Sequence, residues 1–289
     1  MDLIEQLDRH LLNRPKREQK WRWYATDLLK CGRQLFYKKT GVEASNPPEA
    51  GALWKMAAGD ALHTMIIGFI RDAIDPTVVE EEPVTWSQSQ GPVYDLPEEY
   101  VRDEELKKYS EWLVSGRIDA VFHQDGKKKG AEIKTSFGMG IKMVQQKGEP
   151  KDDHLSQAVF YLTLTDLEEI WLFYFGRDNG YRTVFRVYME GEVAVYDQGY
   201  GPKRVPMHMQ TIVALNRLRT LELQISNGEM PPRDFQVAIK NGEIKDQFVA
   251  GKVPYKSDWQ CRYCDFKDLC WIDERMKYVA GDNRGDFHG

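Results

Sequence analysis

Two carboxylates and a lysine have types and spacing suited to hydrolysis of a phosphodiester bond. Glu132 and Lys134 lie two positions apart in the strand-like segment Gly130–Phe137, and Asp119 lies in the strand-like segment Trp112–His123 before it. Alternation along a strand puts Glu132 and Lys134 on one face, and a hairpin at Asp125-Gly126 would bring Asp119 beside them. Mg²⁺ and Mn²⁺ prefer carboxylate oxygens and activate water, and a lysine offsets developing charge.

The Glu-x-Lys pattern has no specificity of its own, because it occurs five times in the chain. Glu243 is the serious alternative, since it follows an Asn241-Gly242 turn. No preceding strand offers that glutamate a partner aspartate, whereas the strand before Glu132 does. The context therefore favours Glu132 over the other four, which are Glu18, Glu105, Glu149 and Glu243.

Cysteine is used four times, and its spacing suggests a metal group. Three cysteines form a C-x2-C-x5-C pattern and the fourth lies far upstream, the set being Cys31, Cys261, Cys264 and Cys270. Four thiolates match tetrahedral zinc or an iron–sulfur cluster, and unconnected buried cysteines are the third possibility. The lone upstream cysteine favours iron–sulfur over zinc. Either group would join the two ends of the chain and stabilise the fold by roughly 4–5 kcal/mol, as a long-loop cross-link does.

Three further polar residues lie on expected helices. His63 follows Gly59 by four positions, so both share one helix face, and a neutral imidazole there could complete a metal site. His123 and His154 are alternative donors. Gln157 and Tyr161 are also one turn apart and could orient the lysine or a phosphate. Core packing is the structural alternative for all of them.

The order of expected elements is helices, then a mixed sheet, then helices, which predicts an α/β or α+β core. Domain boundaries are expected at a helical segment 1–49, a core 50–230, a cysteine-bearing segment 231–275 and a tail 276–289. The expected helices are Leu3–Leu12, Thr26 or Asp27 to Lys39, Ala50–Ala73, Asp152–Asp166 and Pro206–Ser226. The remaining expected strands are Glu169–Phe175 and Tyr181–Met189.

Composition limits the function classes. The 289 residues carry a net charge of −5, with 29% charged residues and no apolar run long enough to cross a membrane. The N-terminus lacks the features of a signal peptide, which predicts a cytoplasmic protein. Seven lysines between Lys127 and Lys151 predict a local phosphate-binding face, or else a solvated loop. The aromatic residues Trp21, Trp23 and Tyr24 could stack on bases or pack in the core.

Taken in order, these motifs resemble the RecB-like branch of the PD-(D/E)XK nucleases, including CRISPR-associated and phage exonucleases and the nuclease domain of AddB. The resemblance spans about Tyr24 to Cys270. Its motifs are the Cys31-Gly32-Arg33 start, Gly59 to His63, Gly116 to Asp119, Glu132-Ile133-Lys134-Thr135, Gln157 to Tyr161, and the C-terminal cysteines.

The resemblance implies a restriction-endonuclease-like α/β core, a mixed sheet flanked by helices, with an iron–sulfur subdomain joining the N- and C-terminal segments. It implies a 4Fe-4S cluster on the four cysteines, and Mg²⁺ or Mn²⁺ held by His63, Asp119, Glu132 and the Ile133 carbonyl. Catalysis would involve Asp119, Glu132, Lys134, Gln157 and Tyr161, and the DNA contacts would be Arg33, Lys142, Gln157 and Tyr161.

The expected substrate is DNA that is single-stranded or has free ends, and a homo-oligomer or a recombination or CRISPR partner is a further expectation. The acidic stretch from Asp75 is longer than the family pattern, so Glu80 or Glu82 could also approach the metal. The alternative function is a DNA-binding or assembly subunit that keeps the fold without cutting. An electron carrier has little support, because ligands so far apart in sequence suit a structural cluster.

Overall fold

The computed structural model describes residues 3–14, 23–87, 113–240, 243–245, 247–250 and 253–272. Trp21, Trp112, most of the acidic stretch after Asp75 and the tail from 276 lie outside these residues. The chain divides into two compact units. The first comprises Met1–Gln19, Lys30–Leu53 and Thr220–Gly289, and the second comprises Lys20–Leu29 and Trp54–Arg219. Among the described helices, none combines the length and apolar character needed to cross a bilayer.

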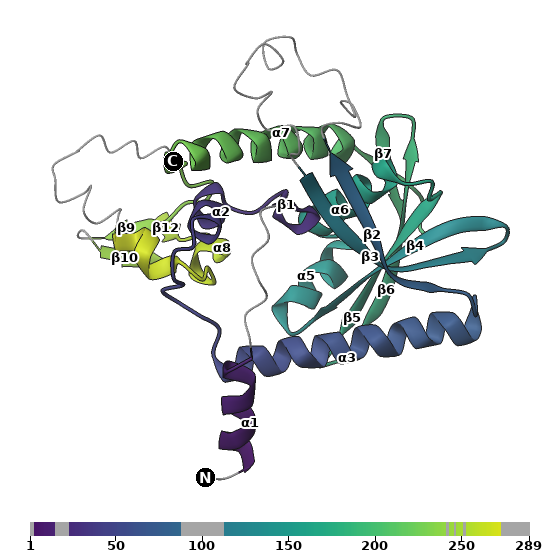
Figure 1. The fold of residues 1–289 in the computed structure, drawn as a ribbon, viewed down its shortest axis with the longest axis horizontal. Coiled ribbons are helices and arrows are strands. Elements are labelled where there is room, and N and C mark those ends of the chain that lie inside the picture. Colours follow the sequence, from purple (N-terminus) through teal and green to yellow (C-terminus); the bar gives the residue numbers. More distant parts are fainter. Residues whose placement is uncertain are drawn as a thin grey trace. The chain divides into compact units, whose positions relative to one another are not determined.

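The second unit contains a mixed sheet of eight described strands in the order β1-β3-β4-β5-β6-β7-β8, with β2 also paired to β3 (Figure 1). The β1–β3 and β4–β5 pairs are parallel and the others antiparallel. A mixed α/β architecture is therefore confirmed. The strands are β1 (Trp23–Tyr24), β2 (Val79–Ser87), β3 (Leu113–Gln124), β4 (Lys127–Ser136), β5 (Glu169–Gly176), β6 (Arg182–Glu190), β7 (Val193–Asp197) and β8 (Lys203–Val205).

The expected hairpin between β3 and β4 is confirmed. Asp125 and Gly126 form its turn with φ angles of 53° and 74°. Two successive left-handed residues match the twist of the flanking strands, which is why Asp-Gly is favoured at this position. The ladder runs from the Gln124–Lys127 pair to the Ala120–Ala131 pair, and the described register between the two strands extends no further.

Helices cover both faces of this sheet. In α3 (Ala50–Ala73), Ile66 and Ile70 pack in one cluster with Phe122 and Ile133. Side chains alternate along β4, so the neighbours of Ile133 in the strand point to the opposite face, where α6 (Asp152–Leu164) lies against β5 and β6. The second unit also contains η1 (Ala25–Asp27) and α5 (Met139–Lys147), and α7 (Met207–Ser226) begins in it.

The expected continuous helix from Thr26 or Asp27 to Lys39 is wrong. The chain forms the short helix η1 and then α2 (Gly32–Lys39), with Cys31 in an extended conformation at the start of α2. Asp27 caps the start of η1, because its Oδ2 accepts a hydrogen bond from the Tyr24 backbone N–H at 3.1 Å. The helical backbone is interrupted at Cys31, where φ is −58° and ψ is 128°, and α2 begins only after it.

Near Asp119 the sheet is irregular. Glu81 in β2 has a φ of 50° and stands opposite Asp119, between the Glu80–Ala120 and Glu82–Ile118 pairs. Ala120 faces the α3 cluster. Regular alternation would put Ile118, two residues earlier, on the same face, but Ile118 lies near Gly130 and Leu167 instead. The regular alternation of β3 is therefore broken at Asp119, where β3 also parts from β4. Irregularities of this kind often re-aim side chains next to active sites.

The first unit contains the elements around the cysteines. Its expected helix Leu3–Leu12 is confirmed as α1. Glu243, the alternative Glu-x-Lys, lies in β10, which pairs with β9 in a separate two-stranded sheet. The other elements wholly within this unit are α2, α8 (Trp259–Arg262), β9 (Ala238–Lys240), β10 (Glu243–Lys245), β11 (Gln247–Ala250) and β12 (Val253–Lys256).

Candidate active site and cysteine pocket

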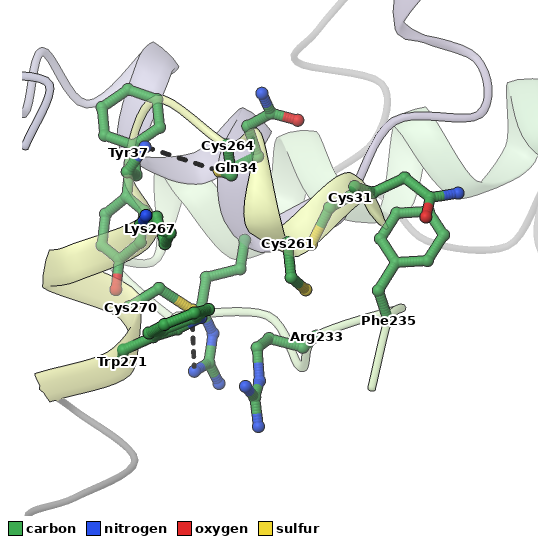
Figure 2. Close-up of a pocket in the computed structure, with 13 residues that line it drawn as sticks. Cys31, Gln34, Tyr37, Arg233, Phe235, Cys261, Cys264, Lys267, Cys270 and Trp271 are labelled. Atoms are coloured by element: carbon green, nitrogen blue, oxygen red, sulfur yellow. Dashed lines mark hydrogen bonds between the residues drawn. The ribbon is translucent and has the colours of Figure 1, made fainter. Parts of the chain in front are cut away.

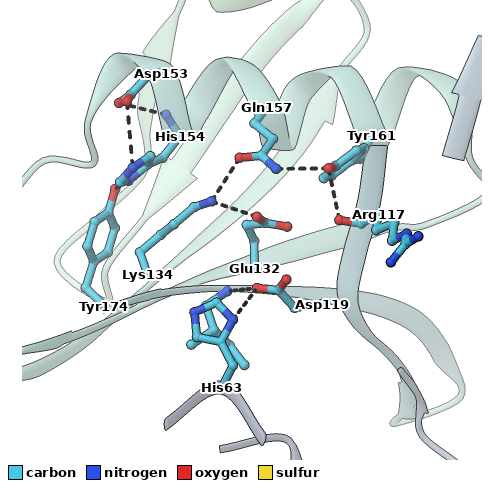
Figure 3. Close-up of polar contacts among 11 residues, drawn as sticks. His63, Arg117, Asp119, Glu132, Lys134, Asp153, His154, Gln157, Tyr161 and Tyr174 are labelled. Atoms are coloured by element: carbon cyan, nitrogen blue, oxygen red, sulfur yellow. Dashed lines mark hydrogen bonds and ion pairs between the residues drawn. The ribbon is translucent and has the colours of Figure 1, made fainter. Parts of the chain in front are cut away.

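Two acidic side chains meet where β3 and β4 separate (Figure 3). Asp119 Oδ2 accepts a hydrogen bond of 2.6 Å from the Ile133 backbone N–H, so this side chain takes the place of the strand partner that the ladder no longer supplies. Glu132 lies next to Ile133 and is only 3% exposed. The separation of the strands thus brings two carboxylates into one confined space.

Lys134 completes this group from the same strand. Its Nζ lies 2.7 Å from Glu132 Oε1 and 2.9 Å from Gln157 Oε1 on α6. The ammonium is mostly shielded from solvent, with 17% of its side chain exposed. The structure therefore brings together Asp119, Glu132 and Lys134, as strand alternation and the hairpin predicted.

A directed chain of hydrogen bonds holds Gln157. Its Nε2 donates to the Tyr161 hydroxyl at 2.9 Å, and that hydroxyl donates to the Arg117 carbonyl at 3.0 Å. Burial raises the pKa of Tyr161, so the phenol stays protonated and remains a donor. Because the amide nitrogen points to the phenol, the amide oxygen points to Lys134. Tyr161 thus fixes the position of the lysine through Gln157.

Gly116 explains how Tyr161 fits. A Cβ atom at this position would lie 2.5 Å from two atoms of the Tyr161 ring and hydroxyl. The aromatic ring therefore rests directly on the backbone of β3, which only glycine allows. The Gly116-to-Asp119 spacing in the sequence reflects this contact at one end and the carboxylate at the other.

His63 approaches Asp119 from α3. Its Nδ1 lies 3.7 Å from Asp119 Oδ2, and burial is the largest cause of a lowered pKa for this imidazole. A neutral ring is the form that ligates metals. Of the two alternative histidines, His123 is beside Asp75 at the other end of β3. His154 Nδ1 lies 2.9 Å from the Tyr174 hydroxyl, and burial and the nearby charge of Lys134 lower its pKa.

Burial and mutual repulsion act against ionisation of the two carboxylates. Burial is the largest cause that raises the pKa of Glu132 to about 7, with the charge of Asp119 adding to it and Lys134 opposing it. Burial also raises the pKa of Asp119. Within the described part of the chain, Glu132 Oε2 is buried without a hydrogen-bond partner. A buried oxygen of this kind is costly unless a donor or a cation satisfies it.

The donor set suits a hard divalent cation, since it offers carboxylate oxygens and a neutral imidazole. In the residues that the structure describes, no three His, Cys, Asp or Glu side chains already stand at metal-binding distances from one another. The fit to such an ion thus rests on two other features: the chemistry of the donor atoms and the buried Glu132 oxygen that has no partner in the described residues.

Sequence reasoning missed Glu81, the acidic residue opposite Asp119. Glu80 instead forms an ion pair with Arg71, and Glu82 takes a regular place in the β2 ladder. Glu81 pairs with Arg117 at 2.6 Å, and its charge is one cause of the raised pKa of Asp119. The sequence prediction named Glu80 or Glu82 from this run of three acids, because no sequence pattern reveals the left-handed backbone at Glu81.

The expected basic face is reduced by pairing. Three of its lysines lie in β4 and form ion pairs across to the start of β5 and the residues before it. The pairs are Lys127–Glu168, Lys128–Asp166 and Lys129–Glu169. Lys142 is exposed on α5, where the predicted contact with DNA stays a prediction.

Trp23 does not offer a base-stacking surface, because it is 1% exposed and part of the core. Of the two alternatives that the sequence left open, core packing is the one that holds for this residue. Its backbone continues the sheet, pairing with Val114 of β3. Tyr24, beside it, is half-buried.

The four cysteines line one pocket of the first unit (Figure 2). Cys31 precedes α2, and the other three come from the C-terminal segment around α8; all four are free thiols. Burial raises the pKa of Cys261 to about 12 and that of Cys264 to about 11, and the neighbouring thiols contribute. The residues far apart in sequence are therefore close enough to influence one another's charge.

Arg33 lies in the same pocket. It is 6% exposed and donates to the Pro231 carbonyl at 3.2 Å and to Cys270 Sγ at 3.9 Å. Burial raises the pKa of Cys270, and the charges of Arg233 and Arg33 oppose part of that rise. These guanidinium groups favour thiolates, the form that binds metals, so the donor set fits a thiolate-ligated centre. The DNA contact expected of Arg33 stays a prediction, and the side chain faces the cysteines.

Comparisons with known proteins add little to this geometry. The chain matches no protein-family model and no curated protein. Among solved structures it is similar to the crystal structure of SSO0001, with 18% sequence identity, 92% of each chain covered and a TM-score of 0.47. A likeness of this size carries no argument about function.

We predict that Gly116→Ala disrupts the site by displacing Tyr161. The added methyl group must displace Tyr161, so Gln157 no longer holds Lys134, and overpacking costs roughly 1–3 kcal/mol of unfolding free energy. Chemical denaturation and activity measurements on the same protein check this. Gly68→Ala, in open space on α3, is the matched control. Equal stability and activity in the Gly116 and Gly68 variants would contradict the packing argument.

We also predict a pH dependence of stability in metal-free protein. The folded-state pKa of Glu132 lies above its ordinary value of 4.5, at about 7, so the folded protein binds this proton more tightly. The free energy of unfolding should therefore fall as pH rises from 4.5 to 7, by on the order of 3 kcal/mol. Glu132→Gln should remove this component. Denaturation curves in EDTA at several pH values measure it, and identical pH profiles for the two proteins would contradict the assignment.

Proposed function

We propose that this chain is a metal-dependent deoxyribonuclease that hydrolyses phosphodiester bonds, of the RecB-like PD-(D/E)XK class. The observation that carries the proposal is the buried, unpartnered Oε2 of Glu132, which lies in a group that also holds Asp119 and Lys134. Burial disfavours the ionised forms of both carboxylates, and positive charge beyond that of Lys134 would stabilise them. A divalent cation supplies that charge and suits these oxygens.

Under this proposal Asp119, Glu132, His63 and the Ile133 carbonyl hold Mg²⁺ or Mn²⁺. The ion would neutralise phosphate charge and lower the pKa of a bound water. Lys134 stands beside Glu132, where its ammonium positions the attacking water or stabilises charge on the phosphate. Gln157 and Tyr161 keep that ammonium in place, as the hydrogen-bond chain from α6 to the Arg117 carbonyl indicates.

The second part of the proposal is a 4Fe-4S cluster on Cys31, Cys261, Cys264 and Cys270, with zinc as the alternative. Four free thiols around one pocket, with two arginines whose charges oppose the rise that burial causes in the pKa of Cys270, support a metal centre there. The role is structural, because the ligands tie the N-terminal part of the unit to its C-terminal part. The resemblance in sequence supports iron–sulfur over zinc.

The direct test is Mn²⁺-dependent degradation of DNA labelled at either end, with single and double strands compared. Glu132→Gln and Lys134→Met should each lower the rate by about 10²–10³-fold, the usual loss when one charge-stabilising group is removed. Glu243→Gln is the matched control, since it alters a Glu-x-Lys pattern outside the main sheet. Wild-type rates in Glu132→Gln would overturn the site, and DNA binding without cleavage by the wild type would favour the non-cutting alternative.

We predict that Cys270→Ser weakens the fold and leaves the chemistry of the second unit intact. Protein purified without oxygen should be brown and contain iron and sulfide, whereas the variant should lose colour and unfold at lower temperature. Metal analysis and thermal unfolding measure both effects. Stoichiometric zinc in a colourless wild-type protein would replace the cluster by the zinc alternative, and a metal-free wild type would contradict any metal centre in the pocket.

A further inference from the structure

Arg177 follows β5, the strand that pairs in parallel with β4, which carries Glu132 and Lys134. Its backbone N–H donates to the Ser136 carbonyl at the end of β4, with a distance of 2.9 Å. Its guanidinium carbon lies 4.1 Å from the centre of the Phe137 ring, and Nη1 donates to the Lys55 carbonyl on α3. Stacking and hydrogen bonding therefore fix the orientation of this side chain.

The guanidinium is also close to the candidate metal ligands. A Cβ atom on Gly59 would lie 3.3 Å from Arg177 Nη1 and 3.1 Å from Thr135 Oγ1, so glycine leaves the space that the arginine enters. Gly59 stands one helical turn before His63, a separation of about 5–6 Å between such positions. The Gly59-to-His63 pattern thus places a cation beside the metal site.

Arg177 has no anionic partner in the described residues. By contrast, four other arginines of this unit form ion pairs with acidic side chains, namely Arg71, Arg117, Arg186 and Arg204. The neighbouring Asp178 accepts a hydrogen bond from the Gly138 backbone N–H instead. Within the described part of the chain Arg177 Nε is buried and has no hydrogen-bond partner. A partly buried guanidinium held in this way favours an anion from outside the chain.

We infer that Arg177 binds a phosphate group of the nucleic-acid strand next to the phosphate that reacts. This inference rests on the proposed function and extends it with a residue that positions the substrate. The planar fork of a guanidinium matches two oxygens of one phosphate, which a lysine does not reproduce. The contacts with Phe137 and Lys55 hold the fork in advance, so little side-chain entropy is lost on binding.

The experiment measures binding of a fluorescent single-stranded oligodeoxynucleotide, with Ca²⁺ in place of Mn²⁺ and at several salt concentrations. Arg177→Gln should raise Kd at least tenfold and reduce the slope of log Kd against log salt by about 0.7, the value for one phosphate contact to a single strand. Arg177→Lys should keep the slope and still weaken binding. Arg186→Gln, which removes an arginine already paired with Asp197, is the matched control.

Thermal unfolding separates a binding role from a structural one. If Arg177→Gln does not fold, Arg177→Lys decides the matter, and wild-type affinity in that variant overturns the inference. If the wild type cuts and binds DNA while Arg177→Gln has the same Kd and slope, the inference alone fails. A wild-type protein that binds no DNA overturns the proposed function and the inference together.

Discussion

The site depends on the separation of two neighbouring strands. Where β3 leaves β4, the Ile133 backbone N–H loses its ladder partner and takes the Asp119 carboxylate instead. This bond holds Asp119 beside Glu132, although like charges in a confined space repel. Lys134 offsets part of that repulsion, and one oxygen of Glu132 still lacks a partner in the described residues. The proposed metal site follows from this imbalance of charge.

Packing on both faces of the sheet maintains the arrangement. On one face, the apolar residues of α3 surround Phe122 and Ile133, and the same helix carries Gly59 and His63. On the other face, Tyr161 rests on the bare backbone of Gly116 and orients Gln157. Both glycines of the sequence motifs therefore serve close approach: one admits a phenol that controls the lysine, and the other admits the guanidinium of Arg177.

Local signals in the sequence predicted much of this site. The Asp-Gly turn identified the hairpin, strand alternation put Glu132 and Lys134 on one face, and helical spacing paired Gln157 with Tyr161. Non-local effects were not predictable. Three lysines of β4, Lys127, Lys128 and Lys129, pair with acids at the start of β5 and in the residues just before it. The left-handed backbone of Glu81 and the position of Arg177 depend on packing between strands and helix that no short pattern encodes.

Anomalous diffraction from crystals soaked in Mn²⁺ tests the central claim most directly, because it locates the ion without relying on activity. We expect a manganese peak between Asp119 and Glu132, within coordination distance of His63, and no such peak in Glu132→Gln crystals. A fully soaked crystal in which Glu132 Oε2 is satisfied by Lys134 or by water, with manganese absent from this site, would contradict it.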